Sequence, residues 1–174
     1  IKAWIENGVK TIVVSSPHCY HSFKNEYPEF GVKFEVFHIS QYLARLIDEG
    51  KLKFTREYGK KVVYHDPCYL GRHNHIYDEP RGVLTRIPGL ELVEMDDSRE
   101  NSLCCGGGGV RIWMDTPKGQ RFSDLRLEQA ADAGAAVLAT SCPYCILNFD
   151  ASRLTMDNGG IDIRDITEIV QEVM

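Results

Sequence analysis

Cysteine is the residue type that dominates the chemistry available to this chain. The 174 residues include six cysteines, namely Cys19, Cys68, Cys104, Cys105, Cys142 and Cys145. A secreted disulfide scaffold would be smaller, and the adjacent Cys104 and Cys105 suit separate structural bridges poorly. Clustered thiols in a cytosolic chain more often bind metal or carry out redox chemistry. The cysteine content therefore predicts a metal or redox site.

The spacing of five cysteines indicates that they share this site. Thirty-five residues separate Cys68 from Cys104, and 36 separate Cys105 from Cys142. Cys68, and the pair Cys142 and Cys145, follow expected strands, and the loop at 101–109 can lie against both. Loops at the carboxyl ends of parallel strands share one edge of a sheet, where ligands bind. Five soft ligands suit an iron–sulfur cluster or zinc better than magnesium or calcium.

Neighbouring residues fit the same chemistry. Gly106, Gly107 and Gly108 leave backbone N–H groups free to donate to sulfur, so we expect them to bind the cofactor. A helix that begins after Cys142 would lower thiol pKa values through its positive end. His65 precedes Cys68 by three residues and could complete a zinc site or donate a proton to a departing thiol. The candidate catalytic residues are Cys104, Cys105 and His65, whereas we expect His38 and His75 to be partly exposed loop residues.

The motif "CPYC" (142–145) has a second interpretation as a glutaredoxin-like dithiol with Cys142 as nucleophile. This alternative leaves Cys68, Cys104 and Cys105 unexplained. Only 29 residues follow Cys145, too few for the remainder of that fold.

Apolar runs that alternate with helical patterns predict an α/β fold with a mostly parallel sheet. The expected strands are residues 10–16, 33–37, 60–66, 90–96, 135–141 and 161–163, and the expected helices are 39–50, 120–134 and 167–174. A formal charge of −5 gives no reason to expect nucleic acid as a partner. The apolar runs fall short of the roughly 20 residues that span a bilayer, so we expect no membrane span and a cytoplasmic location.

Residues 8–23 and 134–149 align without a gap, which indicates an internal repeat. Cys19 matches Cys145, and Ser16 stands where the second copy has Cys142. The match resumes further along, where Ser40 faces Thr167 as the expected helix N-cap. Residues 1–50 are therefore expected to be the end of a first copy, and residues 60–174 a complete second one.

The motifs "HDPCYLGRHN" (65–74), "CCGGGG" (104–109) and "TSCPYC" (140–145) resemble the cysteine-rich CCG domain. This domain occurs in heterodisulfide reductase catalytic subunits and in the iron–sulfur subunits of glycolate, lactate and glycerol-3-phosphate oxidising complexes. The resemblance implies a Rossmann-like fold and an iron–sulfur oxidoreductase active in electron transport or disulfide reduction. It also implies a [4Fe-4S] cluster, of the non-cubane kind in heterodisulfide reductase, whose ligands would be Cys68, Cys104, Cys105, Cys142 and Cys145.

The partners implied by this resemblance are other subunits, or a preceding part, of a redox complex and electron-transferring flavoprotein. Such partners could hold the chain at the inner face of the membrane. Zinc in a structural domain remains the alternative cofactor, and an isolated piece of such a protein could lack the metal altogether.

Overall fold

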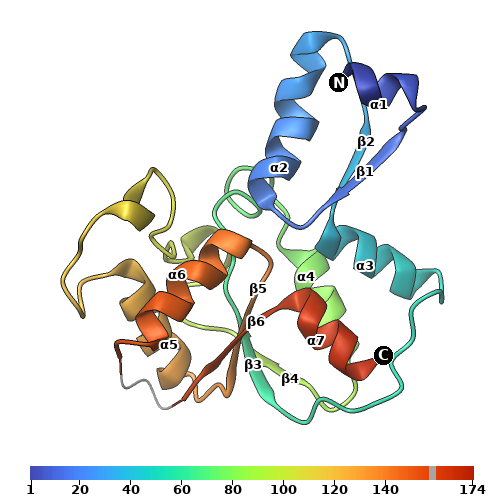
Figure 1. Ribbon diagram of the computed structural model, residues 1–174. Helices are drawn as coiled ribbons and strands as arrows, with labels where there is room; N and C mark the ends of the chain where they lie inside the picture. The colour runs from blue at the N-terminus through green and yellow to red at the C-terminus, as the bar shows by residue number, and fades with distance from the viewer. Residues whose placement is uncertain (157–159) are drawn as a thin grey trace.

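The computed structural model describes residues 1–156 and 160–174 (Figure 1). Its strands are β1 (Thr11–Val14), β2 (Glu35–His38), β3 (Lys61–Tyr64), β4 (Glu91–Val93), β5 (Val137–Thr140) and β6 (Asp162–Asp165). Its α-helices are α1 (Lys2–Glu6), α2 (Pro17–His21), α3 (Ile39–Asp48), α4 (Asp78–Leu84), α5 (Phe122–Asp132), α6 (Pro143–Arg153) and α7 (Ile166–Val173). Short π or 3₁₀ turns lie at Ser22–Glu26, Tyr27–Phe30, Arg99–Asn101 and Arg111–Trp113. None of the helices within these described residues has the length and apolar character needed to cross a membrane.

Two parallel sheets make up the fold. The larger one has the strand order β4-β3-β5-β6, and the smaller one pairs β1 with β2. In the larger sheet Val62 of β3 lies opposite Leu92 of β4 on one side and Val137 of β5 on the other. The predicted α/β class, with parallel strands flanked by helices, is therefore confirmed. The chain goes from β3 to β4 on one side of β3 and then returns to place β5 on its other side. The order of the strands therefore reverses between β3 and β5, and ligands bind at such reversal points in parallel sheets.

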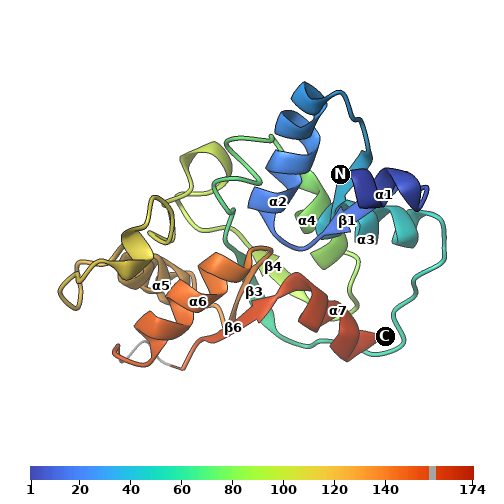
Figure 2. The ribbon, with the colours of Figure 1, turned by 45° about the horizontal axis from the view of Figure 1, so that its top comes forward.

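The four-stranded sheet is covered on both faces. Helices α3, α4 and α7 lie on one side of it, and α5 and α6 lie on the other (Figures 1 and 2). Val62, Val63, Val137 and Leu138 are completely buried. Strands buried on both faces need continuous apolar runs, and this need explains why β3 and β5 stand out in the sequence.

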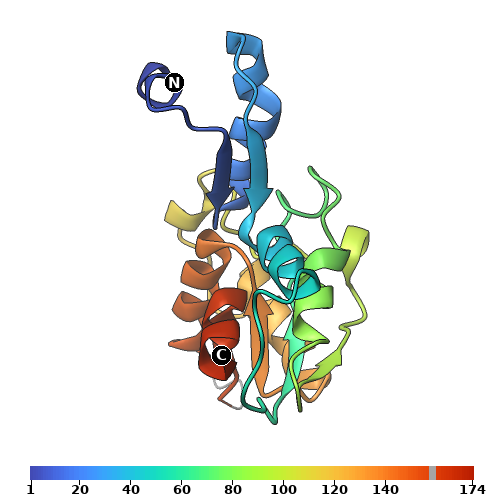
Figure 3. The same ribbon diagram turned by 90° about the vertical axis from the view of Figure 1, so that its right-hand side faces the viewer.

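The aligned segments have the same structure. Residues 11–48 form β1, α2, β2 and α3, and residues 137–173 form β5, α6, β6 and α7. Thr11 pairs with Glu35, and Val137 pairs with Asp162, so the strand registers also correspond. The β1–β2 pair stands beyond the larger sheet (Figure 3). Helix α3 nevertheless packs in the core of the larger sheet, together with α7.

The predicted N-caps, Ser40 and Thr167, were both wrong by two residues. Helix α3 is capped by His38, whose Nδ1 accepts from the Ser40 amide, while the Gln41 side chain accepts from the His38 amide. Helix α7 is capped by Asp165 in the same way. Each predicted cap is instead a first-turn residue that hydrogen-bonds to the true cap. The repeat thus includes a capping box at equivalent positions.

Candidate metal centre

Three loops bring cysteines to the carboxyl edge of the four-stranded sheet. Cys68 follows β3, and Cys104 with Cys105 lies in the loop between β4 and α5. Cys142 is the N-cap of α6, where Pro143 starts the helix, and Cys145 lies in its first turn. The edge therefore collects the five cysteines that the spacing predicted, around the reversal point between β3 and β5.

The five thiols form a continuous series. Each thiol shifts the pKa of the next in the order Cys68, Cys104, Cys105, Cys145 and Cys142, and the last four of these residues pack in one cluster. Three of them are buried, with exposed fractions of 3% for Cys105, 3% for Cys142 and 2% for Cys145. Cys68 and Cys104 are half-buried at one end of the series. All six cysteines of the chain are free thiols.

The local electrostatics favour negative charge at two of the thiols. The neighbouring Cys105 and Cys68 thiols and the Gly106 amide stabilise the Cys104 thiolate and so lower the pKa of Cys104. The Cys145 thiol and the amides at the start of α6 lower the pKa of Cys142. The pKa values of Cys68, Cys105 and Cys145 are raised, because each faces a neighbouring thiol that holds the charge. Packed thiolates repel one another, so ionising the whole series requires a bound cation.

The glycine loop supplies donors to the sulfurs. The Gly106 amide donates to Cys104 Sγ at 3.3 Å, and the Gly107 amide donates to Cys105 Sγ at 3.4 Å. Gly106 has a φ of +81°, and a Cβ there would lie 3.2 Å from Phe122 Cβ, so this position requires glycine. Gly108, the third predicted cofactor-binding glycine, lies exposed beyond them.

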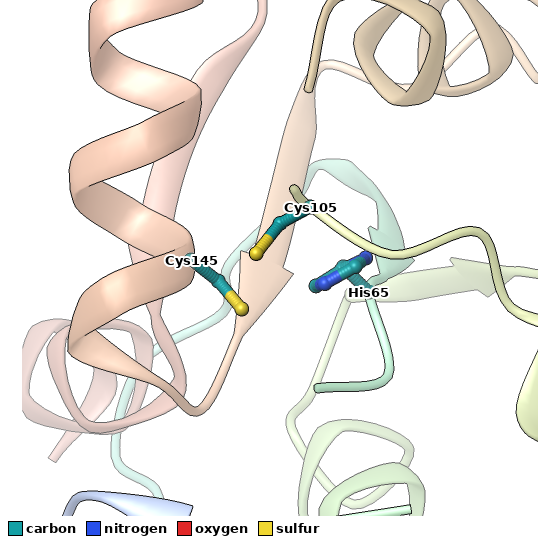
Figure 4. A group of neighbouring side chains, drawn as sticks. All are labelled: His65, Cys105 and Cys145. Atoms are coloured by element: carbon teal, nitrogen blue, oxygen red, sulfur yellow. The ribbon is translucent and has the colours of Figure 1, made fainter. Parts of the chain in front are cut away.

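His65 lies beside the thiol series and is completely buried. One ligand atom from each of His65, Cys105 and Cys145 lies within 4.8 Å of the other two, and the two sulfurs face one end of the imidazole ring (Figure 4). Burial, reinforced by the nearby Arg126 cation, lowers the pKa of His65 to about 3. A neutral imidazole therefore faces the sulfurs at neutral pH.

Two buried arginines hold the loops of the site, and the sequence did not reveal either one. Arg81 binds both oxygens of Asp66 at 2.7 and 2.9 Å and also pairs with Glu94. Arg126 donates to His65 Nδ1 and to the carbonyl of Asp97. Charged residues in helices normally face solvent, so nothing in the helical patterns around Arg81 and Arg126 distinguishes these side chains.

Two other histidines differ in their placement. His38 was expected to be a partly exposed loop residue, but it is completely buried at the end of β2. Its Nε2 lies 3.2 Å from the Ser15 carbonyl. His38 thus links the end of β2 to the end of β1. His75 lies exposed, as expected.

The remaining cysteine, Cys19, is exposed on α2. Helix α2 packs through His18, whose ring lies 4.1 Å from that of Tyr69 and 5.2 Å from that of Tyr144. The first repeat therefore contacts the loop that bears Cys68 and the start of α6, while its own cysteine stays outside the thiol series.

Burial of the "CPYC" pair weighs against the glutaredoxin-like alternative. A nucleophilic dithiol has to be reached by a disulfide substrate, and reactive cysteines are partly exposed. Cys142 and Cys145 are instead enclosed, and Cys145 lies beside Cys105. The site is suited to holding a metal or cluster between thiolates.

Comparison with known proteins agrees with this geometry. A family model described as CCG, cysteine-rich domain, matches residues 62–150. The chain is 40% identical over 173 residues to a probable iron-sulfur-binding oxidoreductase, FadF, of Bacillus subtilis, covering 99% of this chain and 24% of that protein. It is 37% identical over 175 residues to an EtfAB:quinone oxidoreductase of Syntrophomonas wolfei, covering 96% and 24%.

A third relative is one component of the dihydromethanophenazine:CoB–CoM heterodisulfide reductase of Methanosarcina barkeri. It is 36% identical over 178 residues, which cover all of this chain and 43% of that relative. The chain thus spans between about a quarter and somewhat under half the length of these three relatives. The family match covers more than half of the chain and includes all five cysteines of the series. This chain belongs to the CCG cysteine-rich domain family.

Proposed function

We propose that this chain is the iron–sulfur module of an oxidoreductase, with a [4Fe-4S] cluster bound by Cys68, Cys104, Cys105, Cys142 and Cys145. The observation that carries this proposal is the continuous series of five thiols from three loops. A structural zinc site needs four ligands, so the fifth thiol is surplus for zinc and useful for an asymmetric cluster. The relatives named as iron–sulfur and heterodisulfide oxidoreductases support the same assignment.

When bound, such a cluster would accept and release single electrons, for transfer or for disulfide reduction. The surrounding residues of the chain suit that task. Amides of Gly106 and Gly107 donate to the sulfurs of Cys104 and Cys105, which stabilises negative charge. Phe149 is completely buried and packs edge-on against His65 at 4.8 Å, so this side of the site is closed to water. Cys68 and Cys104 lie at the more open end, where a substrate or partner could approach.

We also propose that the module works beside other redox proteins or further segments of a longer polypeptide. The name of the Syntrophomonas wolfei relative includes EtfAB and a quinone, which supports an electron-transferring flavoprotein as one partner. Attachment to a membrane would then come through partners. The division into residues 1–50, the end of one repeat, and 60–174, a complete domain, belongs to the same proposal.

Metal and sulfide analysis of protein purified without oxygen tests the assignment. We expect about four irons and a matching amount of acid-labile sulfide per chain, with an EPR signal on reduction or oxidation. One zinc per chain and no sulfide would instead assign the structural-metal function. A chain that holds neither iron with sulfide nor zinc, even after anaerobic reconstitution with iron and sulfide, would contradict both the cluster assignment and the zinc assignment.

A further inference from the structure

The two ring nitrogens of His65 have different surroundings. Its Nε2 atom is buried and has no hydrogen-bond partner within residues 1–156 and 160–174. Its Nδ1 atom lies 3.3 Å from Nε of Arg126. With Nδ1 engaged by Arg126, Nε2 is the nitrogen left to face the sulfurs of Cys105 and Cys145 (Figure 4). The role of His65 therefore depends on which nitrogen bears the proton.

Arg126 fixes the location of that proton. A guanidinium group has only donors, so His65 Nδ1 has to accept with its lone pair. The arginine itself is held in place, because Nη1 donates to the Asp97 carbonyl at 2.7 Å and to Gln129 Oε1 at 2.6 Å. Its Nη2 donates to Ser102 Oγ at 3.2 Å. A neutral ring with a lone pair on Nδ1 carries its hydrogen on Nε2.

A metal ligand needs a lone pair at the coordinating nitrogen, and an Nε2–H group has none to offer. We propose that Arg126 holds His65 as the Nε2–H tautomer, which donates toward the sulfurs of Cys105 and Cys145 instead of binding the metal. The effect on a bound cluster rests on the proposed function. The tautomer of His65 does not, because the residues of the chain alone determine it. It assigns Arg126 and His65 as positioning residues.

The expected consequence is an effect on reduction potential. Hydrogen bonds to cluster sulfurs stabilise the more negative, reduced state and so raise the potential. An N–H donor in a buried, apolar environment acts more strongly than one exposed to water. The ring is also held in a fixed orientation, since Phe149 packs edge-on against it.

The tautomer can be measured on the metal-free chain by ¹⁵N NMR of the histidine ring nitrogens. We expect His65 to show a protonated Nε2 and an unprotonated Nδ1. His38 is an internal reference, because its Nδ1 accepts from the Ser40 amide and it should give the same pattern. Arg126→Met should shift the His65 signals while leaving those of His38 unchanged. A protonated Nδ1 at His65 in the unaltered chain would overturn the proposal, and this measurement does not depend on whether the variant folds.

The loaded protein provides the second test. His65→Leu should retain the metal and sulfide content of the parent but have a more negative midpoint potential. A tenfold loss of preference for the reduced state corresponds to about 59 mV for one electron. His65→Gln, whose amide can still donate, should recover part of the shift, and the exposed His75→Leu should show none.

Loss of metal in both His65→Leu and His65→Gln would identify His65 as a ligand and overturn the proposal. An unchanged potential in His65→Leu would overturn it as well. Failure of the parent chain to bind iron and sulfide would instead contradict the proposed function, and the NMR result on the tautomer would stand separately.

Discussion

The two aligned segments, called repeats here and comprising residues 11–48 and 137–173, share a scaffold and differ in what that scaffold supports. Each has a strand, a helix opened by proline, a second parallel strand and a helix with a capping box. Strand β5 is buried along its whole length between β3 and β6. Among the residues that the structure describes, β1 pairs only with β2, and it alternates between exposed and half-buried residues. The second repeat gains its thiol series from loops after β3 and β4, which have no counterpart within residues 1–50. A strand and a helix with cysteine are therefore insufficient to make the site.

The cysteines at equivalent positions provide the largest contrast. Cys145→Ala should abolish iron and sulfide binding, because it interrupts the thiol series between Cys105 and Cys142. Cys19→Ala should leave the metal content unchanged, since Cys19 is exposed on α2. Iron and sulfide analysis of both variants checks this expectation. Equal loss in the two variants would mean that the first repeat contributes to the site after all.

The phenylalanines at equivalent positions should differ in stability. Phe149 is completely buried, and Phe149→Ala should cost about 3–5 kcal/mol of unfolding free energy. Phe23 is half-buried against Trp4 and Tyr27, so Phe23→Ala should cost only about 1–2 kcal/mol. Denaturant unfolding of the metal-free protein measures both values. Similar costs would show that the small sheet is packed as tightly as the large one.

The two helix caps differ in their response to pH. Burial lowers the pKa of His38 to about 4, so the unfolded chain takes up this proton first as pH falls. Neutral His38 therefore contributes about 3 kcal/mol to the unfolding free energy above pH 6.5. This contribution is lost as the pH falls toward 4. Unfolding free energies measured between pH 7 and 4 should therefore fall less steeply in His38→Asn, which keeps a cap without an ionisable ring. Parallel pH curves would exclude His38 as the group responsible.

These contrasts also show how far the sequence could predict the molecule. Buried β-branched runs and short cysteine motifs are local signals, and they located β3, β5 and the edge at which the five thiols meet. The cap at His38 was missed because Ser40, a commoner capping type, lies only two residues away. Asp165 was missed although aspartate caps at least as often as threonine, because the alignment of Thr167 with Ser40 set the prediction. The contact of Arg126 with His65 joins residues 61 positions apart. Such a buried pairing depends on how α5 packs against the sheet, and no local pattern encodes it.

The smallest effect concerns the cap of α7. Asp165 accepts from the Thr167 amide at 2.9 Å, and Asp165→Ala should cost about 1 kcal/mol of unfolding free energy. Burial raises the pKa of this carboxyl, so the neutral Asp165→Asn should be tolerated better than the alanine variant at pH 7. Thr167→Ala should cost less than Asp165→Ala, because its hydroxyl bonds to the cap without replacing it. Thermal unfolding of the three variants would rank them, and a greater loss for Thr167→Ala would restore Thr167 as the true cap. The ranking matters for the repeat, since it tests whether the shared feature of the two copies is the capping box itself or only the spacing of similar residues.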